Sequence, residues 1–516
     1  MGLNVLTYFK EKTTKSQWLA FVGTFICTIL AHLYHFANGL PGRDSFLNYY
    51  ADQNILGSGR WALSVACGFS SYYDLPWVIG ISSCLFLALA AVAVVSVLEI
   101  KNPMLVLITG ALMATAPTVT ETFVFLYTAD GYMIAMALAA FAVWFSRIEE
   151  GRPGRWILSA VCICIACGIY QAYVSLSLIL AVCYFMLELM KNRYEKKAYI
   201  SWAFRQVIIF AAALAAYYLI WQLCMKVQHV VPNDYQGIAE VGTISTNLLV
   251  HGLKSSIRTF KWYFAPWSVA TYGFTPYIAL NLVFVLFFVI SLIVAVWKSE
   301  IWKRPWAVIL MVLCLAAIIP FSSIWYFTSY SVYYRAMMLP GMVVLFVFAA
   351  LNLEYWGKQM LQNLFGCLLI AVILNNMVMA NIVYFHMNLC YERTYAQAIA
   401  MMDDIREQQS LHNVDQYTIV GQRYEETILK GNDPEYGTTN EIGQIQLFTS
   451  ILDEDLFIEG IRISSFLDMV FGQKMEYHEN AVSLEDPEIQ QMPSWPQDGS
   501  MMVIDDMLVI KLSDNP

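Results

Sequence analysis

The residues best suited to chemistry are charged side chains in a loop that follows the first apolar stretch. Asp44 and Asp52 lie in this loop, and Arg60 follows them. A carboxylate can take a proton from an acceptor hydroxyl as a general base. The planar fork of an arginine matches the oxygens of a phosphate leaving group. The loop therefore suggests group transfer, and the alternative is a solvated loop with a surface ion pair.

Two further carboxylates lie at the ends of apolar stretches. Asp130 begins one of them, where a plain N-cap for the first helical turn is the simpler interpretation. Glu121 ends the preceding stretch and is either a polar helix end or a second carboxylate facing the same cavity as Asp44. A carboxylate at a membrane boundary costs desolvation free energy unless it is paired or hydrated, so both are candidate functional residues.

Arg335 precedes another apolar stretch and follows several tyrosines. An arginine in this position is either an interfacial anchor that extends toward water or a ligand for the phosphate of a lipid carrier. His32 and His35 are three residues apart and would supply half of a metal site, but no other histidine or cysteine group completes it in sequence. Packing is the favoured interpretation of this pair, and no metal site is predicted.

The composition indicates a membrane protein. The mean hydropathy is +0.54 and 13% of the residues are charged, which does not describe a soluble chain. A helix needs about 20 apolar residues to cross a hydrocarbon core of roughly 30 Å. The apolar stretches predict about eleven transmembrane helices, near 17–36, 77–98, 104–119, 129–146, 156–169, 171–189, 203–226, 277–297, 305–322, 336–353 and 361–386.

Charge predicts the topology. Lys and Arg concentrate in the segments that are cytoplasmic if the N-terminus is cytoplasmic. An odd number of helices then places the C-terminus on the extracytoplasmic side. Residues 168–171 are either a tight outer turn between two helices or a break inside one tilted helix, and a miscount there would reverse this prediction.

The chain divides near Met387. Residues 1–386 carry a net charge of +8 and residues 387–516 one of −17, so a transmembrane domain precedes a soluble acidic domain. The acidic domain is predicted to have a small α/β or α+β fold, with a helix at Tyr391–Gln408. It would repel nucleic acid. Its predicted strands are Gln416–Val420, Gln444–Phe448, and a hairpin of Met501–Ile504 with Met507–Lys511.

Five short motifs follow one another along the chain. They are Asp44-Ser45 with Gly59-Arg60, Tyr127 with Asp130-Gly131-Tyr132, Gly168-Ile169-Tyr170-Gln171, Tyr334-Arg335 with Pro340, and Asn381–Tyr395. Their order and spacing resemble the Gtr type II glucosyltransferases, bacterial and phage-encoded membrane enzymes related to the GT-C glycosyltransferases. The resemblance covers most of residues 20–400 and implies a GT-C-like helical membrane fold.

The resemblance implies an enzyme of the bacterial plasma membrane. Such an enzyme takes a sugar, typically glucose, from a polyprenyl-phosphate donor on the extracytoplasmic face and attaches it to a cell-surface glycan or lipid-linked acceptor. Asp44 matches the family's acidic residue in the first outer loop and is the expected general base, with Asp52 in reserve. Arg60 or Arg335 would lie near the carrier phosphate.

The remaining expected substrate-binding residues are Glu121, Asp130, Tyr170 and Gln171. This chain has Asp44-Ser45 where some family members have two adjacent acidic residues. That difference counts against a paired-carboxylate or metal-dependent scheme, although a divalent cation stays open. No other cofactor is expected.

Two other classes of protein compete with the enzyme. A transporter or flippase of lipid-linked sugars should have paired broken helices and buried ionisable groups in two matching halves, and the sequence shows no such symmetry. A non-catalytic scaffold presenting the acidic domain would leave the charges of the first loop unexplained.

Overall fold

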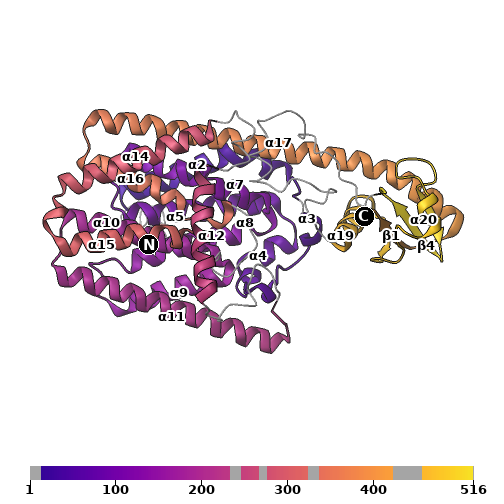
Figure 1. Ribbon diagram of the computed structural model, residues 1–516, viewed down its shortest axis with the longest axis horizontal. Coiled ribbons are helices and arrows are strands. Elements are labelled where there is room, and N and C mark those ends of the chain that lie inside the picture. Colours follow the sequence, from indigo (N-terminus) through magenta and orange to yellow (C-terminus); the bar gives the residue numbers. More distant parts are fainter. Residues whose placement is uncertain are drawn as a thin grey trace, which may run out of the picture.

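The computed structural model describes residues 13–42, 44–232, 246–265, 276–323, 336–421 and 456–514. Arg335 and the predicted strand Gln444–Phe448 lie outside these residues. Within them the chain forms a bundle of helices joined by one long helix to a small sheet (Figure 1).

Nine helical stretches in the described part of the chain are long and apolar enough to cross a membrane, which supports a polytopic membrane protein. The two other expected helices are α9 (Pro153–Ile169) and α16 (Met342–Trp356), with 17 and 15 residues. The nine stretches are α2 (Lys15–Asn38), α5 (Pro76–Val97), α6 with α7 (Pro103–Thr115 and Pro117–Val124), η2 with α8 (Leu126–Thr128 and Ala129–Phe145), η3 with α10 (Gln171–Tyr173 and Val174–Lys191), α11 (Lys196–Gln228), α14 (Tyr277–Lys298), α15 (Pro305–Ser322) and residues Gln359–Leu389 of α17.

Proline and capping residues set where several of these helices begin. The side chain of Thr14 accepts a hydrogen bond from the backbone of Gln17, which returns one to Thr14, so a capping box starts α2. Helices α5, α6, α7, α9 and α15 each begin with proline at the first position, where its missing N–H costs nothing. Pro117 also breaks the span that contains α6 and α7, because Ala116 before it is extended.

Small residues let the central helices pack closely. Helix α5 packs against α2 and α8, and its Ala88, Ala90, Ala91 and Ala93 are fully buried. Small side chains allow backbones to approach in a membrane, where packing rather than the hydrophobic effect drives association.

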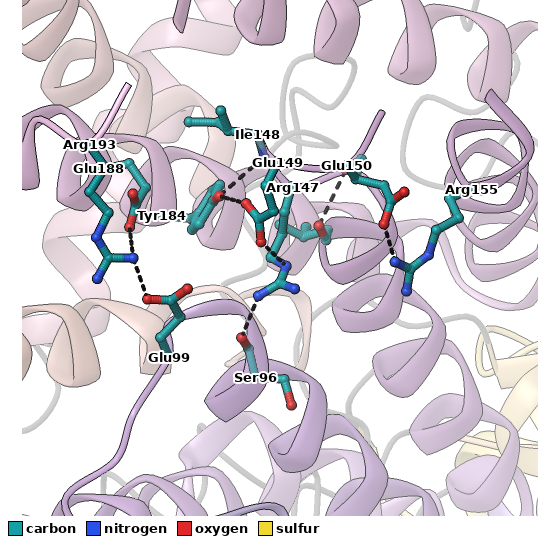
Figure 2. Close-up of polar contacts among 12 residues, drawn as sticks. Ser96, Glu99, Arg147, Ile148, Glu149, Glu150, Arg155, Tyr184, Glu188 and Arg193 are labelled. Atoms are coloured by element: carbon teal, nitrogen blue, oxygen red, sulfur yellow. Dashed lines mark hydrogen bonds and ion pairs between the residues drawn. The ribbon is translucent and has the colours of Figure 1, made fainter. Parts of the chain in front are cut away.

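One end of the bundle carries ion pairs among the helix ends and the loops that join them (Figure 2). Arg193 lies 2.6 Å from Glu99 and Lys191 lies 3.0 Å from Glu188. Burial raises the pKa of the Glu99 carboxyl, but its hydrogen bond to Arg193 and the nearby positive charges outweigh this and hold the pKa below its usual range. Nearby, Arg147 pairs with Glu149 at 3.0 Å. We call this the paired end.

The other end carries residues 39–75, including α3 (Ser45–Asn48), η1 (Leu56–Ser58) and α4 (Leu63–Tyr72). We call it the site end, because most of the candidate residues gather there. Helix α12 (Thr246–Phe264) packs against α14 and α15.

Helix α17 (Gln359–His412) runs for 54 residues from the bundle into the C-terminal domain. It passes the predicted domain boundary at Met387 without interruption. Met387 is the last residue of the large core of the bundle, and Ala398 begins the α17 contribution to the core of the C-terminal domain. Figure 1 shows this helix along the length of the molecule.

The C-terminal domain contains a four-stranded mixed sheet in the order β2-β1-β4-β3. Strand β1 (Gln416–Val420) is parallel to β2 (Glu476–Tyr477) and β4 (Met507–Lys511), and β3 (Met501–Ile504) is antiparallel to β4. Three of these strands lie where the sequence predicts them, but the two-residue β2 was not predicted. Helices α19 (Leu456–Phe471) and α20 (Pro487–Gln491) complete the domain.

Candidate functional site

The loop that carries Asp44 is fixed to the end of α7. Gly39 ends α2 with φ +56°, a left-handed conformation that favours glycine. The backbone N–H of Gly42 donates to Ser45 Oγ at 2.8 Å. A Cβ at Gly42 would lie 2.8 Å from the carbonyl oxygen of Val124, at the end of α7. The chain therefore reaches Asp44 by passing closely over α7.

Asp44 lies directly before α3 and is half-buried. Its carbonyl oxygen accepts from the backbone N–H of Leu47 at 3.2 Å and from Asn48 Nδ2 at 2.7 Å. Its carboxylate makes no capping hydrogen bond to α3. The backbone of Asp44 is thus held by the helix that follows it, while helix capping does not account for its side chain.

Asp52 lies in the same loop and is exposed. Its Oδ1 accepts from the backbone N–H of Asn54 at 3.0 Å, which is the geometry of an Asx turn. Asn54 in turn donates to Gln228 of α11 at 3.0 Å. Asp52 therefore shapes the loop between α3 and η1.

Arg60 is brought together with two tyrosines from distant helices. Its Nη1 donates to the Tyr132 hydroxyl at 3.1 Å. Its guanidinium carbon lies 4.6 Å from the centroid of the Tyr170 ring, as in a cation–π contact. The Tyr132 and Tyr170 rings stack with centroids 4.7 Å apart. A guanidinium oriented by two aromatic rings is suited to an anionic ligand.

Gln171 holds the loop that carries Arg60. Its Nε2 donates to the carbonyl oxygen of Ser58 at 2.7 Å and to the Tyr217 hydroxyl at 3.0 Å. The Tyr217 hydroxyl donates to the carbonyl oxygen of Gly59 at 3.1 Å. A Cβ at Gly59, where φ is +79°, would overlap the Tyr217 hydroxyl. The close approach and the positive φ both require glycine.

Asp130 is buried and joins α8 to α4. Its Oδ2 accepts from Ser70 Oγ at 2.6 Å, and its Oδ1 accepts from the N–H of Gly131 at 2.9 Å. The N-cap of α8 is Thr128. The interpretation of Asp130 as an N-cap is therefore wrong: it lies inside the first turn and docks α4.

Glu121 on α7 is 2% exposed. Its Oε2 accepts from the backbone N–H of Met337 at 2.8 Å, and Thr118 of the same helix donates to the carbonyl oxygen of Leu339 at 3.3 Å. Glu121 thereby anchors η7 (Ala336–Met338), which directly follows Arg335 in sequence.

A family model described as glucosyl transferase GtrII matches residues 33–353. The chain belongs to the GtrII family. The match confirms the family expected from the sequence motifs and includes Asp44, Arg60, Glu121 and Asp130. The GtrII match assigns a glucosyl transfer role, which makes the protein a membrane glycosyltransferase. No curated protein and no solved structure matches the chain.

The histidine pair of this GtrII protein packs inside the bundle. His32 lies 2.6 Å from the Tyr384 hydroxyl and 2.9 Å from the carbonyl oxygen of Ala114. His35 stacks on the Tyr384 ring and lies 2.7 Å from the carbonyl oxygen of Phe123. Among the described residues, no group of three or more His, Cys, Asp or Glu side chains could hold a metal ion.

Asp74 is one of the acidic residues expected near the outer face, without a specific role, and it contacts the GtrII site loop. Its Oδ2 accepts from the backbone N–H of Tyr50 at 2.7 Å. Burial raises the pKa of the Asp74 carboxyl to about 6, against a smaller lowering by this hydrogen bond. The carboxylate therefore fastens the end of the loop that begins at Asp44.

Sequence reasoning also missed Ser70, Tyr217 and Trp221. Trp221 Nε1 donates to the carbonyl oxygen of Leu56 at 2.9 Å, one helical turn from Tyr217 on α11. A weak signal existed, because Tyr217 and Trp221 are spaced to share one face of α11. Nothing in the sequence indicated that this face meets residues 56–59.

Proposed function

We propose that the protein transfers glucose from a polyprenyl-phosphate donor to a cell-surface glycan or a lipid-linked acceptor. The transfer takes place on the extracytoplasmic face of the bacterial plasma membrane, and the site end lies on that face. The family match supports glucosyl transfer. The observation that carries the choice of donor is an apolar groove that ends next to η3, where Gln171 holds the loop of Arg60.

The groove lies between α10, α11 and α15 and has a volume of about 570 Å³. Its lining is almost entirely apolar, with Gln206 as an exception. Val207 and Leu313 line it and are largely exposed, so the groove opens toward lipid. Such a groove can hold a hydrocarbon chain, and it has too few polar groups to bind a sugar nucleotide.

One end of the groove lies next to η3, which adjoins Tyr170, a ring that contacts Arg60. Val174, the first residue of α10, lines the groove and directly follows η3, which contains Gln171. A lipid chain lying there with its phosphate at the site end has the phosphate close to Tyr170 and Arg60. The positive charge of Arg60 and the apolar groove together favour a lipid phosphate as the leaving group.

The transfer itself needs few protein groups. Asp44 takes the proton of the acceptor hydroxyl, and the oxygen of that hydroxyl forms a bond to the anomeric carbon of glucose. The bond from this carbon to the phosphate oxygen breaks with inversion, and the carrier phosphate leaves with the bonding electron pair. Arg60 stabilises the negative charge of the leaving phosphate, and the groove holds the lipid in position.

The test is glucose transfer from a polyprenyl-phosphate-glucose donor in membranes of gene-deleted cells that carry either the wild type or Asp44→Asn. The two proteins are compared at matched amounts in the membrane. Loss of a general base is expected to lower kcat by about 10²–10⁴-fold. The control is Asp52→Asn, which alters the same loop and is expected to retain most of the transfer.

Two results would contradict the proposal. Full transfer by Asp44→Asn removes Asp44 from the mechanism. A wild type that moves lipid-linked glucose across a vesicle membrane without transferring it supports the flippase alternative instead.

A further inference from the structure

Phe46 belongs to the site loop, yet its side chain packs in the core of the C-terminal domain. The residue follows Asp44 by two positions and is 6% exposed. Its ring meets the ring of Phe466 on α19 edge-on, with centroids 4.8 Å apart and planes at 81°. Tyr49 lies edge-on to Phe46 at 5.4 Å. Figure 1 shows α3 and α19 facing each other between the bundle and the sheet.

The hydrophobic core around Phe46 is formed mainly by the C-terminal domain, while α3 as a whole also contacts η2 of the bundle. The hydrophobic core that includes Phe46 also contains Met402, Tyr417 and Phe466. Phe46 is not part of the large core of the membrane helices. A change in the packing of Phe46 therefore leaves the core of the membrane bundle intact.

Helix α3 is too short to hold its own position. It has four residues, and a single helical turn is unstable in isolation. Two of its residues bind Asp44 directly: the carbonyl oxygen of Asp44 accepts from the backbone N–H of Leu47 and from Asn48 Nδ2. The close contact of Gly42 with the end of α7 holds the loop before Asp44, and the packing of Phe46 against Phe466 holds α3 directly after it.

Helix α17 takes part in the core of the bundle and in that of the C-terminal domain. Tyr384 on α17 contacts His32 of α2 inside the membrane region. Further along the same helix, Asp404 accepts from Trp495 Nε1 at 3.0 Å, and the ring of Tyr391 lies 6.4 Å from that of Phe466. An unbroken helix thus connects the inside of the bundle to the surroundings of Phe46.

We infer that the C-terminal domain positions the general base: Phe466 holds Phe46, and Phe46 holds the turn that carries Asp44. Phe46 and Phe466 are positioning residues, because neither touches the reacting atoms. The inference rests on the proposed role of Asp44. It assigns to the acidic domain, which lies outside the matched residues 33–353, a part in the chemistry of the membrane domain.

The test compares Phe466→Ala and Phe46→Ala with the conservative Phe46→Leu in the full-length protein. Each alanine variant is expected to lower kcat by roughly tenfold, the scale of one lost aromatic contact, with an unchanged KM for the donor. The double variant is expected to fall no further than either single variant, because both remove the same contact. Phe46→Leu is expected to recover most of kcat.

A matched control separates positioning from loss of domain stability. Ile489 is fully buried in a different cluster of the same domain, together with Val420 and Val509. Ile489→Ala should lower the stability of the domain and leave kcat near the wild-type value. An equal loss of kcat in Ile489→Ala and Phe466→Ala would overturn the inference.

Hydrogen exchange gives a readout that does not depend on activity. In Phe466→Ala, the peptide covering residues 44–49 is expected to exchange faster, while peptides of α5 and α8 are unchanged. Faster exchange with unchanged transfer overturns positioning and leaves the proposed function intact. Unchanged exchange would show that Phe466 does not hold residues 44–49 in place. A wild type without transferase activity refutes the proposed function, and the exchange result still decides whether Phe466 holds the loop.

Discussion

Arg60 rests its guanidinium 4.6 Å from the centroid of the Tyr170 ring, although 110 positions separate the two residues in the chain. The contact is one of several that lock η1 onto η3 and α11. Because Arg60 also donates to Tyr132, two contacts within the protein set its orientation. Such preorganisation reduces the cost of placing a positive charge next to the phosphate leaving group that we propose.

Replacing Arg60 by lysine is expected to keep the charge and lose its orientation. The ammonium group cannot stack on Tyr170 while presenting a planar fork to a phosphate. We expect Arg60→Lys to lower kcat/KM for the lipid-linked donor by about 10- to 100-fold, and Arg60→Ala to lower it further. Steady-state kinetics over a range of donor concentrations measure both. Equal kcat/KM for lysine and arginine would show that orientation is irrelevant.

Filling the groove is expected to weaken binding of the lipid donor selectively. Ala317 lines the groove on α15, and Ala317→Trp would occupy volume needed by a hydrocarbon chain. We expect the KM for a long-chain donor to rise about tenfold, while a short-chain donor is affected less. Val312 on the same helix is 58% exposed and does not line the groove, so Val312→Trp is the control. An equal effect of both substitutions would argue that the lipid lies elsewhere.

The pKa of Asp74 predicts a pH-dependent contribution to stability. Its folded-state pKa of about 6 is above the ordinary value of 3.8, so ionisation costs folding free energy as pH rises from about 4 to above 6. Because the side chain is partly exposed, solvent screening reduces the effect to roughly 1 kcal/mol. Asp74→Asn removes the charge and keeps an acceptor for Tyr50.

We therefore expect Asp74→Asn to be more stable than the wild type above pH 7, with the difference vanishing toward pH 4. Thermal unfolding in detergent at several pH values measures this difference. Asp74→Ala separates the charge from the hydrogen bond, because alanine removes both. A difference in Tm that does not change with pH would contradict the assignment.

The membrane helices could be predicted because each depends only on a local run of apolar residues. Residues 168–171 illustrate the limit of this approach. The sequence allowed either a turn or a break, and the structure has Tyr170 extended between α9 and η3. Local composition cannot choose between these, because contacts there come from distant residues, as where Gly168 packs so closely on Trp61 that a Cβ would overlap its ring.

The candidate site could be predicted only as a set of residue types. Arg60 and Tyr170 were both identified, but the contact between them was not. Asp130 with Ser70 and Glu121 with Met337 join residues 60 and 216 positions apart. A single sequence carries no information about such pairs, since each member is an ordinary polar residue in its own segment.

Helix α17 fixes the separation between the end of its apolar span and the C-terminal sheet. From residue 390 to His412 it continues for 23 residues past the apolar span that ends at Leu389, which is about 35 Å at a rise of 1.5 Å per residue. The separation between the end of the apolar span and the C-terminal sheet is therefore set by a count of helical residues and not by a flexible linker.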